Sequence, residues 1–290
     1  MSIATTHREE TKETVARKVS DAITELSFRD IVLATVLRTS PLYVVHDEHT
    51  TAFTDGEGVY IGEKFAEDKS IHLPFVLGHE AYHMILGHPL HQTQLRDYAE
   101  KHFKRYGDTV VEIMKTLTPT IYNVVADAVV NDLLKRKGFP LPEGGVDLDI
   151  PKYSPASFIE VIMKSLGVEL DNKTKKEINE IVKKNNSIEA TYRILKMLAK
   201  ILKQNLPRIK KPHGPIGIGD GAGGREGPVT PIDDVVPVGE GEKRTGNKKK
   251  TNVTGVPKKT PKEPVESRCP GSSRAGREGE KEKKKEGGGG

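Results

Sequence analysis

Two histidines and a glutamate carry the most specific chemical signal in the sequence. His79, Glu80 and His83 form a His-Glu-x-x-His pattern within the apolar segment FVLGHEAYHMILGH. In a helix, positions i and i+4 lie one turn apart on the same face, so both imidazoles can reach one metal ion. Zinc lowers the pKa of a bound water to about 7, and an adjacent carboxylate can then take its proton. The pattern therefore predicts a Zn²⁺ site with His79 and His83 as ligands and Glu80 as general base.

The apolar neighbours of this pattern favour a metal. Burying two imidazoles and a carboxylate among Val, Leu, Met and Ile side chains costs free energy unless a partner neutralises them, and a metal ion would do so. The alternative is a core helix whose histidines are satisfied by nearby carbonyl groups.

A catalytic zinc site needs a third protein ligand, and the segment TIYNVVADAVVNDLL offers one. Asn123, Asp127 and Asn131 follow one another at i, i+4 and i+8, which places them on one stripe of an otherwise apolar helix. A carboxylate in that setting requires a cation. We predict Asp127 as the third ligand and the two asparagines as groups that orient the ligands. The alternatives are an N-terminal capping network and a polar stripe that faces solvent.

Three further histidines are rival ligands: His88, His91 and His102. His88 follows His83 by five residues, about 140° round a helix, and is predicted to point away. His102 sits in the charged segment EKHFKRYG and is predicted to lie on a solvated face.

The predicted elements give a mainly helical α+β fold. Short β-type segments at 42–45, 50–54 and 58–61, with Asp55-Gly56 as a turn signal, predict a small antiparallel sheet before the His-Glu-x-x-His helix. Apolar spacing predicts helices elsewhere, over 9–38, from Pro74 through the motif, and over 92–116, 119–137, 154–166, 173–184 and 187–205.

Composition divides the chain at Pro207. Residues 207–290 hold 18 of the 28 glycines and 10 of the 18 prolines and carry a net charge of +7, which leaves residues 1–206 at −2. We therefore predict a folded domain over 1–206 with a helical C-terminal extension, and a disordered basic tail over 207–290. The tail is expected to contact polyanions weakly, whereas a near-neutral core argues against stable nucleic-acid binding.

Other classes of protein are disfavoured. Cys269 is the only cysteine, so neither a disulfide framework nor a thiolate metal site is expected. Without an apolar leader or a run approaching about 20 apolar residues, no membrane span is expected and a cytoplasmic location is predicted. The metzincin pattern would need Gly and His where Leu86 and Pro89 stand. The Gly-rich segment GDGAGG at 219–224 is interpreted as linker.

Three motifs together resemble a known family. Thr54-Asp55-Gly56, GHEAYHMILGHPL at 78–90 and NVVADAVVNDLL at 123–134 resemble the zincin-like zinc-metallopeptidase domain usually found N-terminal to a von Willebrand factor A-like domain. The resemblance covers roughly residues 10–140. It implies a zincin-like fold, zinc ligands at the two motif histidines, a catalytic carboxylate at Glu80 and a third ligand at Asp127. No Asp-x-Ser-x-Ser signature of a von Willebrand domain follows.

The sequence therefore predicts a zinc-dependent peptidase acting on a protein or peptide substrate. Tyr82 and Tyr122 could stabilise an oxyanion, although core packing is the simpler role for both. One alternative is a protease of DNA-bound proteins similar to the SprT-like zincins, with His102 replacing Asp127 as ligand. The other is a catalytically inactive, zinc-stabilised interaction module.

Overall fold

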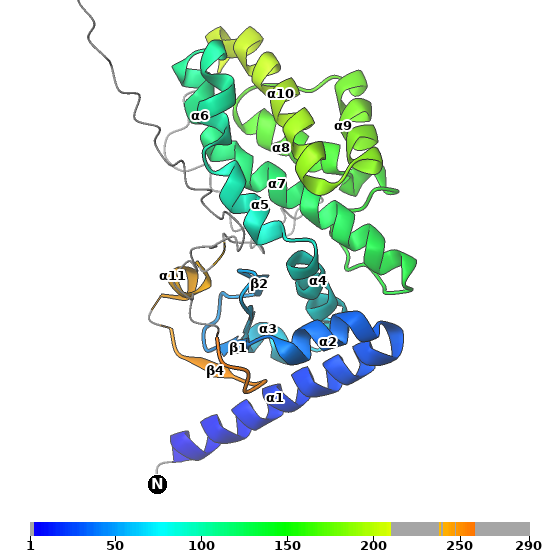
Figure 1. The fold of residues 1–290 in the computed structure, drawn as a ribbon, viewed down its shortest axis with the longest axis vertical. Coiled ribbons are helices and arrows are strands. Elements are labelled where there is room, and N and C mark those ends of the chain that lie inside the picture. The colour runs from blue at the N-terminus through cyan, green and yellow to red at the C-terminus, as the bar shows by residue number, and fades with distance from the viewer. Residues whose placement is uncertain (1–2, 210–237, 239, 247, 259–290) are drawn as a thin grey trace, which may run out of the picture. The chain divides into compact units, whose positions relative to one another are not determined.

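A computed structural model describes residues 3–209, 238, 240–246 and 248–258, all within one compact unit, Met1–Lys258. The helices are α1 (Ile3–Arg29), α2 (Ile31–Thr39), α3 (Glu63–Glu67), α4 (Leu73–Ile85), α5 (His88–Leu95), α6 (Tyr98–Phe103), α7 (Asp108–Arg136), α8 (Pro155–Ser165), α9 (Asn172–Lys184), α10 (Ser187–Asn205) and α11 (Gly241–Thr245). The strands and short 3-10 helices are β1 (Leu42–Val45), β2 (Ala52–Thr54), β3 (Val59–Gly62), β4 (Lys250–Asn252), η1 (Lys104–Tyr106), η2 (Pro151–Tyr153) and η3 (Leu206–Arg208). The predicted mainly helical α+β fold is confirmed (Figure 1).

The sheet is mixed rather than antiparallel, and it has four strands in the order β2-β3-β1-β4. The Asp55-Gly56 turn joins β2 and β3 as an antiparallel hairpin, as the sequence predicts. However, β1 pairs in parallel with β3, with Leu42 opposite Val59. Strand β3 therefore lies between β2 and β1, and every one of its residues is buried. The connection after β1 carries the chain past the position of β3, so β2 lies on the far side of β3. The hairpin then returns β3 between β2 and β1, in the same direction as β1.

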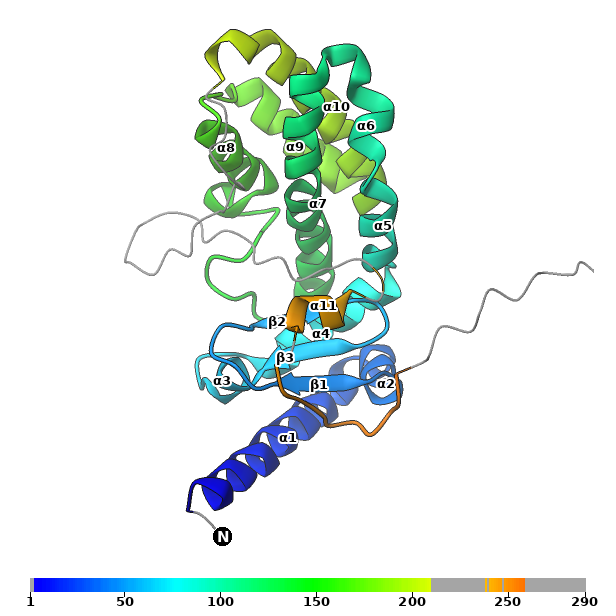
Figure 2. The ribbon, with the colours of Figure 1, turned by 90° about the vertical axis from the view of Figure 1, so that its left-hand side faces the viewer.

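The two faces of the sheet pack against different layers. Alternate side chains of β1 to β3 enter one core with α1, α2 and α4, and they include Leu42, Val44, Ala52, Val59 and Ile61. The opposite face carries Val45, Phe53 and Tyr60. There the guanidinium of Arg244 from α11 lies 4.5 Å from the centre of the Phe53 ring. The sheet therefore lies between α11 and the N-terminal helices (Figure 2).

Part of the predicted tail belongs to this sheet. The expectation of a disordered segment over all of 207–290 is not met at β4, which pairs antiparallel with β1. The carboxylate of Asp55, which is fully buried, accepts a hydrogen bond of 3.1 Å from the backbone N–H of Gly241. Composition missed this segment because strand addition relies on main-chain hydrogen bonds and needs no periodic apolar face. Residues 210–237 and 259–290 lie outside the described residues, so the prediction for them remains a prediction.

A second core lies among the later helices. Apolar side chains of α6 to α10 form one cluster, and α7 contributes to both cores because Val130 and Leu134, near its C-terminal end, pack with the sheet region. The sequence predicted two separate helices over 92–116 and 119–137, but α7 runs without a break across residues 117–119, including Pro119. The chain turns instead at Gly107, where φ is 101°. Burial of Leu117 and Ile121 offsets the hydrogen bond that proline removes. No helix among the described residues is long and apolar enough to cross a membrane.

Close packing of α4 against its neighbours places the His-Glu-x-x-His motif. A Cβ atom added at Gly78 would lie 3.3 Å from Cδ2 of Leu134 on α7 and 3.4 Å from Cδ1 of Leu26 on α1. Glycine at this position therefore lets α4 approach both helices. The next residue in the chain is His79, so this approach brings the motif beside α7 (Figure 1).

Substituting Gly241 tests whether α11 docks on the sheet. A Cβ atom there would lie 2.4 Å from Cε2 of Tyr60 and 2.6 Å from Oδ2 of Asp55, so a larger side chain must displace the helix or buried groups. We expect Gly241→Val to lower the free energy of unfolding of the full chain by about 1–3 kcal/mol, measured by urea denaturation. Lys243→Val, at an exposed position of the same helix, is the control. Equal stability of the two variants would contradict the docking.

Candidate metal centre

Four polar side chains are buried where α4 meets α7. His79, Glu80 and His83 come from α4 and are 8%, 2% and 0% exposed, whereas Asp127 comes from the middle of α7 and is 5% exposed. The sequence predicted each of these four residues for the site. The packing of α4 against α7 brings His79, His83 and Asp127 together although 44 positions separate His83 from Asp127.

The donor atoms of three of these residues converge. Nε2 of His79 and Nε2 of His83 are 2.8 Å apart, and Oδ1 of Asp127 lies 3.8 Å from the first and 3.5 Å from the second. Ligands bound to one tetrahedral zinc at about 2.0–2.1 Å stand about 3.3 Å apart, which is close to this arrangement. His79, His83 and Asp127 can therefore hold a metal ion.

The outer nitrogen of His79 is held by Asn131, as expected for a group that orients a ligand. Nδ1 of His79 lies 3.0 Å from Oδ1 of Asn131, and Nδ2 of Asn131 donates to the carbonyl oxygen of Val146 at 2.9 Å. The second bond fixes which end of the amide faces the histidine. His79 therefore donates from Nδ1, which leaves the lone pair of Nε2 for a metal. Asn123 instead accepts a hydrogen bond of 2.8 Å from Gln92 of α5.

His88 does not point away from the site, so that prediction from helical spacing was wrong. The chain leaves the helical path after α4, Gly87 adopts a left-handed conformation with φ of 68°, and α5 starts at His88. This break turns the His88 ring back, so that its Nδ1 lies 2.7 Å from Nδ1 of His83. Gly87 and Pro89 on either side of His88 were the signal of a break, because glycine often ends helices and proline often starts them.

His83 and His88 are both electrically neutral at pH 7. Burial, with smaller contributions from His79 and His88, lowers the pKa of His83 well below its ordinary value. Burial also lowers the pKa of His88 to about 3, helped by the nearby His91 and His79. A metal-binding imidazole must be neutral to offer a lone pair, so burial prepares His83 to bind a metal at physiological pH.

A family model described as "Putative metallopeptidase domain" matches residues 14–288. The chain belongs to this metallopeptidase-domain family. The match extends far beyond the region that carries the sequence motifs, through α8, α9 and α10. No curated protein and no solved structure gives a significant match to the chain.

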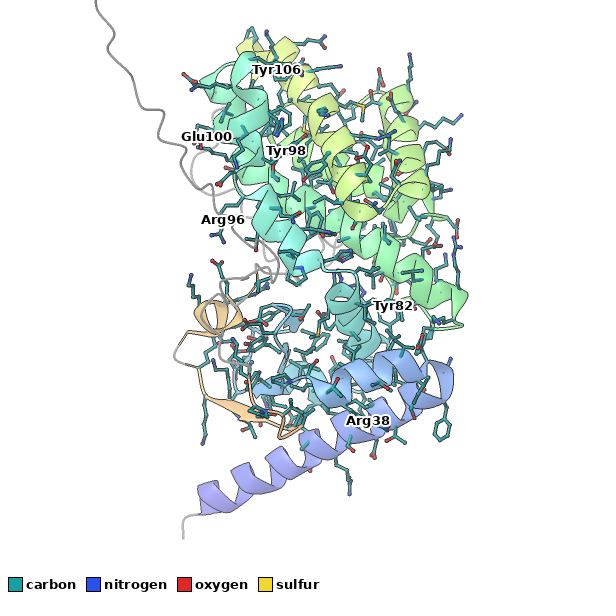
Figure 3. All side chains as sticks on the ribbon, in the orientation of Figure 1. Arg38, Tyr82, Arg96, Tyr98, Glu100 and Tyr106 are labelled. Carbon is teal, nitrogen blue, oxygen red and sulfur yellow. The ribbon has the colours of Figure 1, made fainter. Side chains whose placement is uncertain are left out.

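Two rival histidines of the metallopeptidase domain stay outside the cluster. Nδ1 of His91 lies 3.0 Å from the hydroxyl of Tyr122. His102 is exposed on α6, where its ring stacks on Tyr98 with centroids 4.3 Å apart. Figure 3 shows Tyr98 among the upper helices and Tyr82 on α4, below them. This arrangement gives no support to His102 as a metal ligand.

The two tyrosines considered for oxyanion stabilisation have other contacts. The hydroxyl of Tyr82 is hydrogen-bonded to Lys137 beyond the end of α7, and burial raises its pKa. Tyr122 is fully buried, contacts His91, and has a pKa raised by burial. Both side chains are thus protonated core residues of the metallopeptidase domain.

Metal analysis tests the three-residue cluster. We expect the full chain to retain one divalent transition-metal ion after dialysis, and His79→Ala, His83→Ala or Asp127→Ala to lose it, because two donors leave the ion under-coordinated. His102→Ala is the matched control and should retain the ion. Retention by Asp127→Ala together with loss in His102→Ala would identify a different third ligand.

Proposed function

We propose that this metallopeptidase domain is a zinc-dependent enzyme that hydrolyses peptide bonds, with Glu80 as the general base. The observation that carries the proposal is the buried cluster of His79, His83 and Asp127, with Glu80 next to the first histidine on the same helix. Membership of the family supports peptide hydrolysis as the reaction.

The donor set favours zinc. Two imidazole nitrogens and one carboxylate oxygen are typical protein ligands of catalytic zinc, which keeps a fourth position open for water or substrate. When bound, zinc would supply a Lewis acid and a water whose pKa is lowered to about 7. Soft thiolate ligands are absent from the cluster, whose three members are two histidines and an aspartate.

Glu80 is suited to the proton transfer. Its position next to His79 lets a non-ligating carboxylate face the same site, and at 2% exposure it is shielded from bulk solvent. Glu80 would accept a proton from the attacking water and return it to the leaving amine, which is the role of a general base and then acid. During this proton transfer, the hydrogen bond from His79 to Asn131 would keep the His79 ring in its position.

The sheet offers a place for an extended substrate. In the part of the sheet that the structure describes, β2 is an edge strand, paired on one side with β3. It also contacts α4, which carries Glu80 and the two histidines (Figure 1). A peptide pairing with the outer edge of β2 would gain main-chain hydrogen bonds with little dependence on its sequence. We therefore propose an extended protein segment as the substrate class.

A glutamine at position 80 separates catalysis from metal binding. We expect Glu80→Gln to keep its zinc and its fold but to hydrolyse an unfolded, casein-like protein about 10²–10⁴-fold more slowly, because the amide cannot accept the proton. Glu112→Gln, at an exposed position of α7, is the matched control and should match wild type.

Two results would contradict the peptidase proposal. Equal hydrolysis by wild type and Glu80→Gln would place the reaction at another site. A zinc-loaded wild type without hydrolysis of any unfolded protein would instead favour a zinc-stabilised interaction module.

A further inference from the structure

We propose that His88 is a positioning residue of the metal centre: it holds His83 in the tautomer and orientation that aim Nε2 at the ion, and Ser187 of α10 holds His88 in turn. This inference rests on the ligand role proposed for His83. It assigns a role to a histidine from α5 and a serine from α10, neither of which belongs to the His-Glu-x-x-His motif.

The first link is the contact between two ring nitrogens. Nδ1 of His88 and Nδ1 of His83 lie 2.7 Å apart, and both rings are buried. Two neutral imidazoles at this distance share one proton, so one nitrogen donates and the other accepts. If His83 binds the ion through Nε2, its proton stands on Nδ1, and Nδ1 of His88 must be the acceptor.

The second link fixes His88 itself. With Nδ1 accepting, the proton of the neutral His88 ring stands on Nε2, which lies 3.0 Å from Oγ of Ser187. Ser187 is 4% exposed and is the first residue of α10, whose preceding residue Asn186 caps the helix by accepting from the N–H of Glu189. Its position is therefore set by the start of a long, well-packed helix.

Tyr122 and His91 lie beyond Ser187. Burial raises the pKa of Tyr122 and Ser187 lowers it to a smaller extent, and the hydroxyl of Tyr122 lies 3.0 Å from Nδ1 of His91. Along the two contacts of His88, His83 donates to His88 and His88 donates to Ser187. Reversing only the His88–Ser187 bond would leave the His88 ring without a proton on either nitrogen, which a neutral imidazole does not allow. Binding of the ion through Nε2 of His83 therefore fixes the tautomers of His83 and His88 together.

Two substitutions at position 88 separate positioning from packing. His88→Leu fills a similar volume without an acceptor, whereas His88→Asn places Oδ1 on Cγ, where Nδ1 of histidine is attached. We expect His88→Leu to weaken Zn²⁺ binding by the full chain about 10–100-fold and His88→Asn to restore most of the affinity. Zn²⁺ affinity is measured by competition with a chromophoric chelator. His102→Leu is the control, and thermal midpoints of the metal-free proteins check folding.

The outcomes distinguish this inference from the proposed function. If His79→Ala abolishes Zn²⁺ binding while His88→Leu weakens it less than about tenfold, the positioning role is wrong and the metal site stands. Equal losses in His88→Leu and His88→Asn would also overturn the positioning role, because the restored acceptor would have had no effect. A wild type that binds no Zn²⁺ would overturn the metal site and the positioning role together.

Histidine ring ¹⁵N spectra of the zinc-loaded protein provide a readout that packing does not affect. We expect His88 to be protonated at Nε2 and His83 at Nδ1, with Nε2 of His83 shifted by the metal. A proton on Nδ1 of His88 would overturn the proposed direction of the hydrogen bonds.

Discussion

Two imidazoles and a carboxylate are buried where α4 crosses α7, and the neighbouring elements are arranged to satisfy them. His79, His83 and Asp127 lose water when α4 packs against α7, and each lost hydrogen bond must be replaced. The structure replaces the outer bonds with an amide from α7 and a histidine from α5, and it leaves the three inner donor atoms facing one point. A cation at that point would stabilise the fold as well as the site. The unfolded chain has no preformed site, so the free energy of metal binding adds to the free energy of folding.

Helix α7 connects this site to both cores. Its first part packs with α6, α8 and α10, and its last part packs with α1, α4 and the sheet region. Asp127 lies between these parts, so the two cores hold the carboxylate from both directions. The contact of Ser187 with His88 adds α10 to the same arrangement. The later helices are therefore part of the metallopeptidase domain, in agreement with a family match that extends to residue 288.

The Thr54-Asp55-Gly56 motif, one of the three that resemble the zinc-metallopeptidase family, has a structural role. Oδ1 of Asp55 accepts from the N–H groups of Glu57 and Gly58, which closes the hairpin turn. Oδ2 of the same carboxylate accepts from Gly241, which anchors the returning C-terminal segment on the sheet. One buried aspartate thus joins the turn before α4 to a segment 186 residues later. This link stabilises the sheet whose edge we propose for substrate binding.

The candidate ligands could be predicted from the sequence, because helical periodicity is local: i and i+4 spacing placed His79 with His83, and Asp127 with Asn131, on single faces. The sequence also located α8, α9 and α10 almost to the residue. The parallel pairing of β1, the addition of β4 and the continuity of α7 through Pro119 could not be predicted from local patterns, since they depend on contacts between distant segments. The orientation of His88 could not be predicted either. The left-handed conformation of Gly87 ends the helix, so the angle of about 100° per residue no longer gives the direction of the His88 side chain.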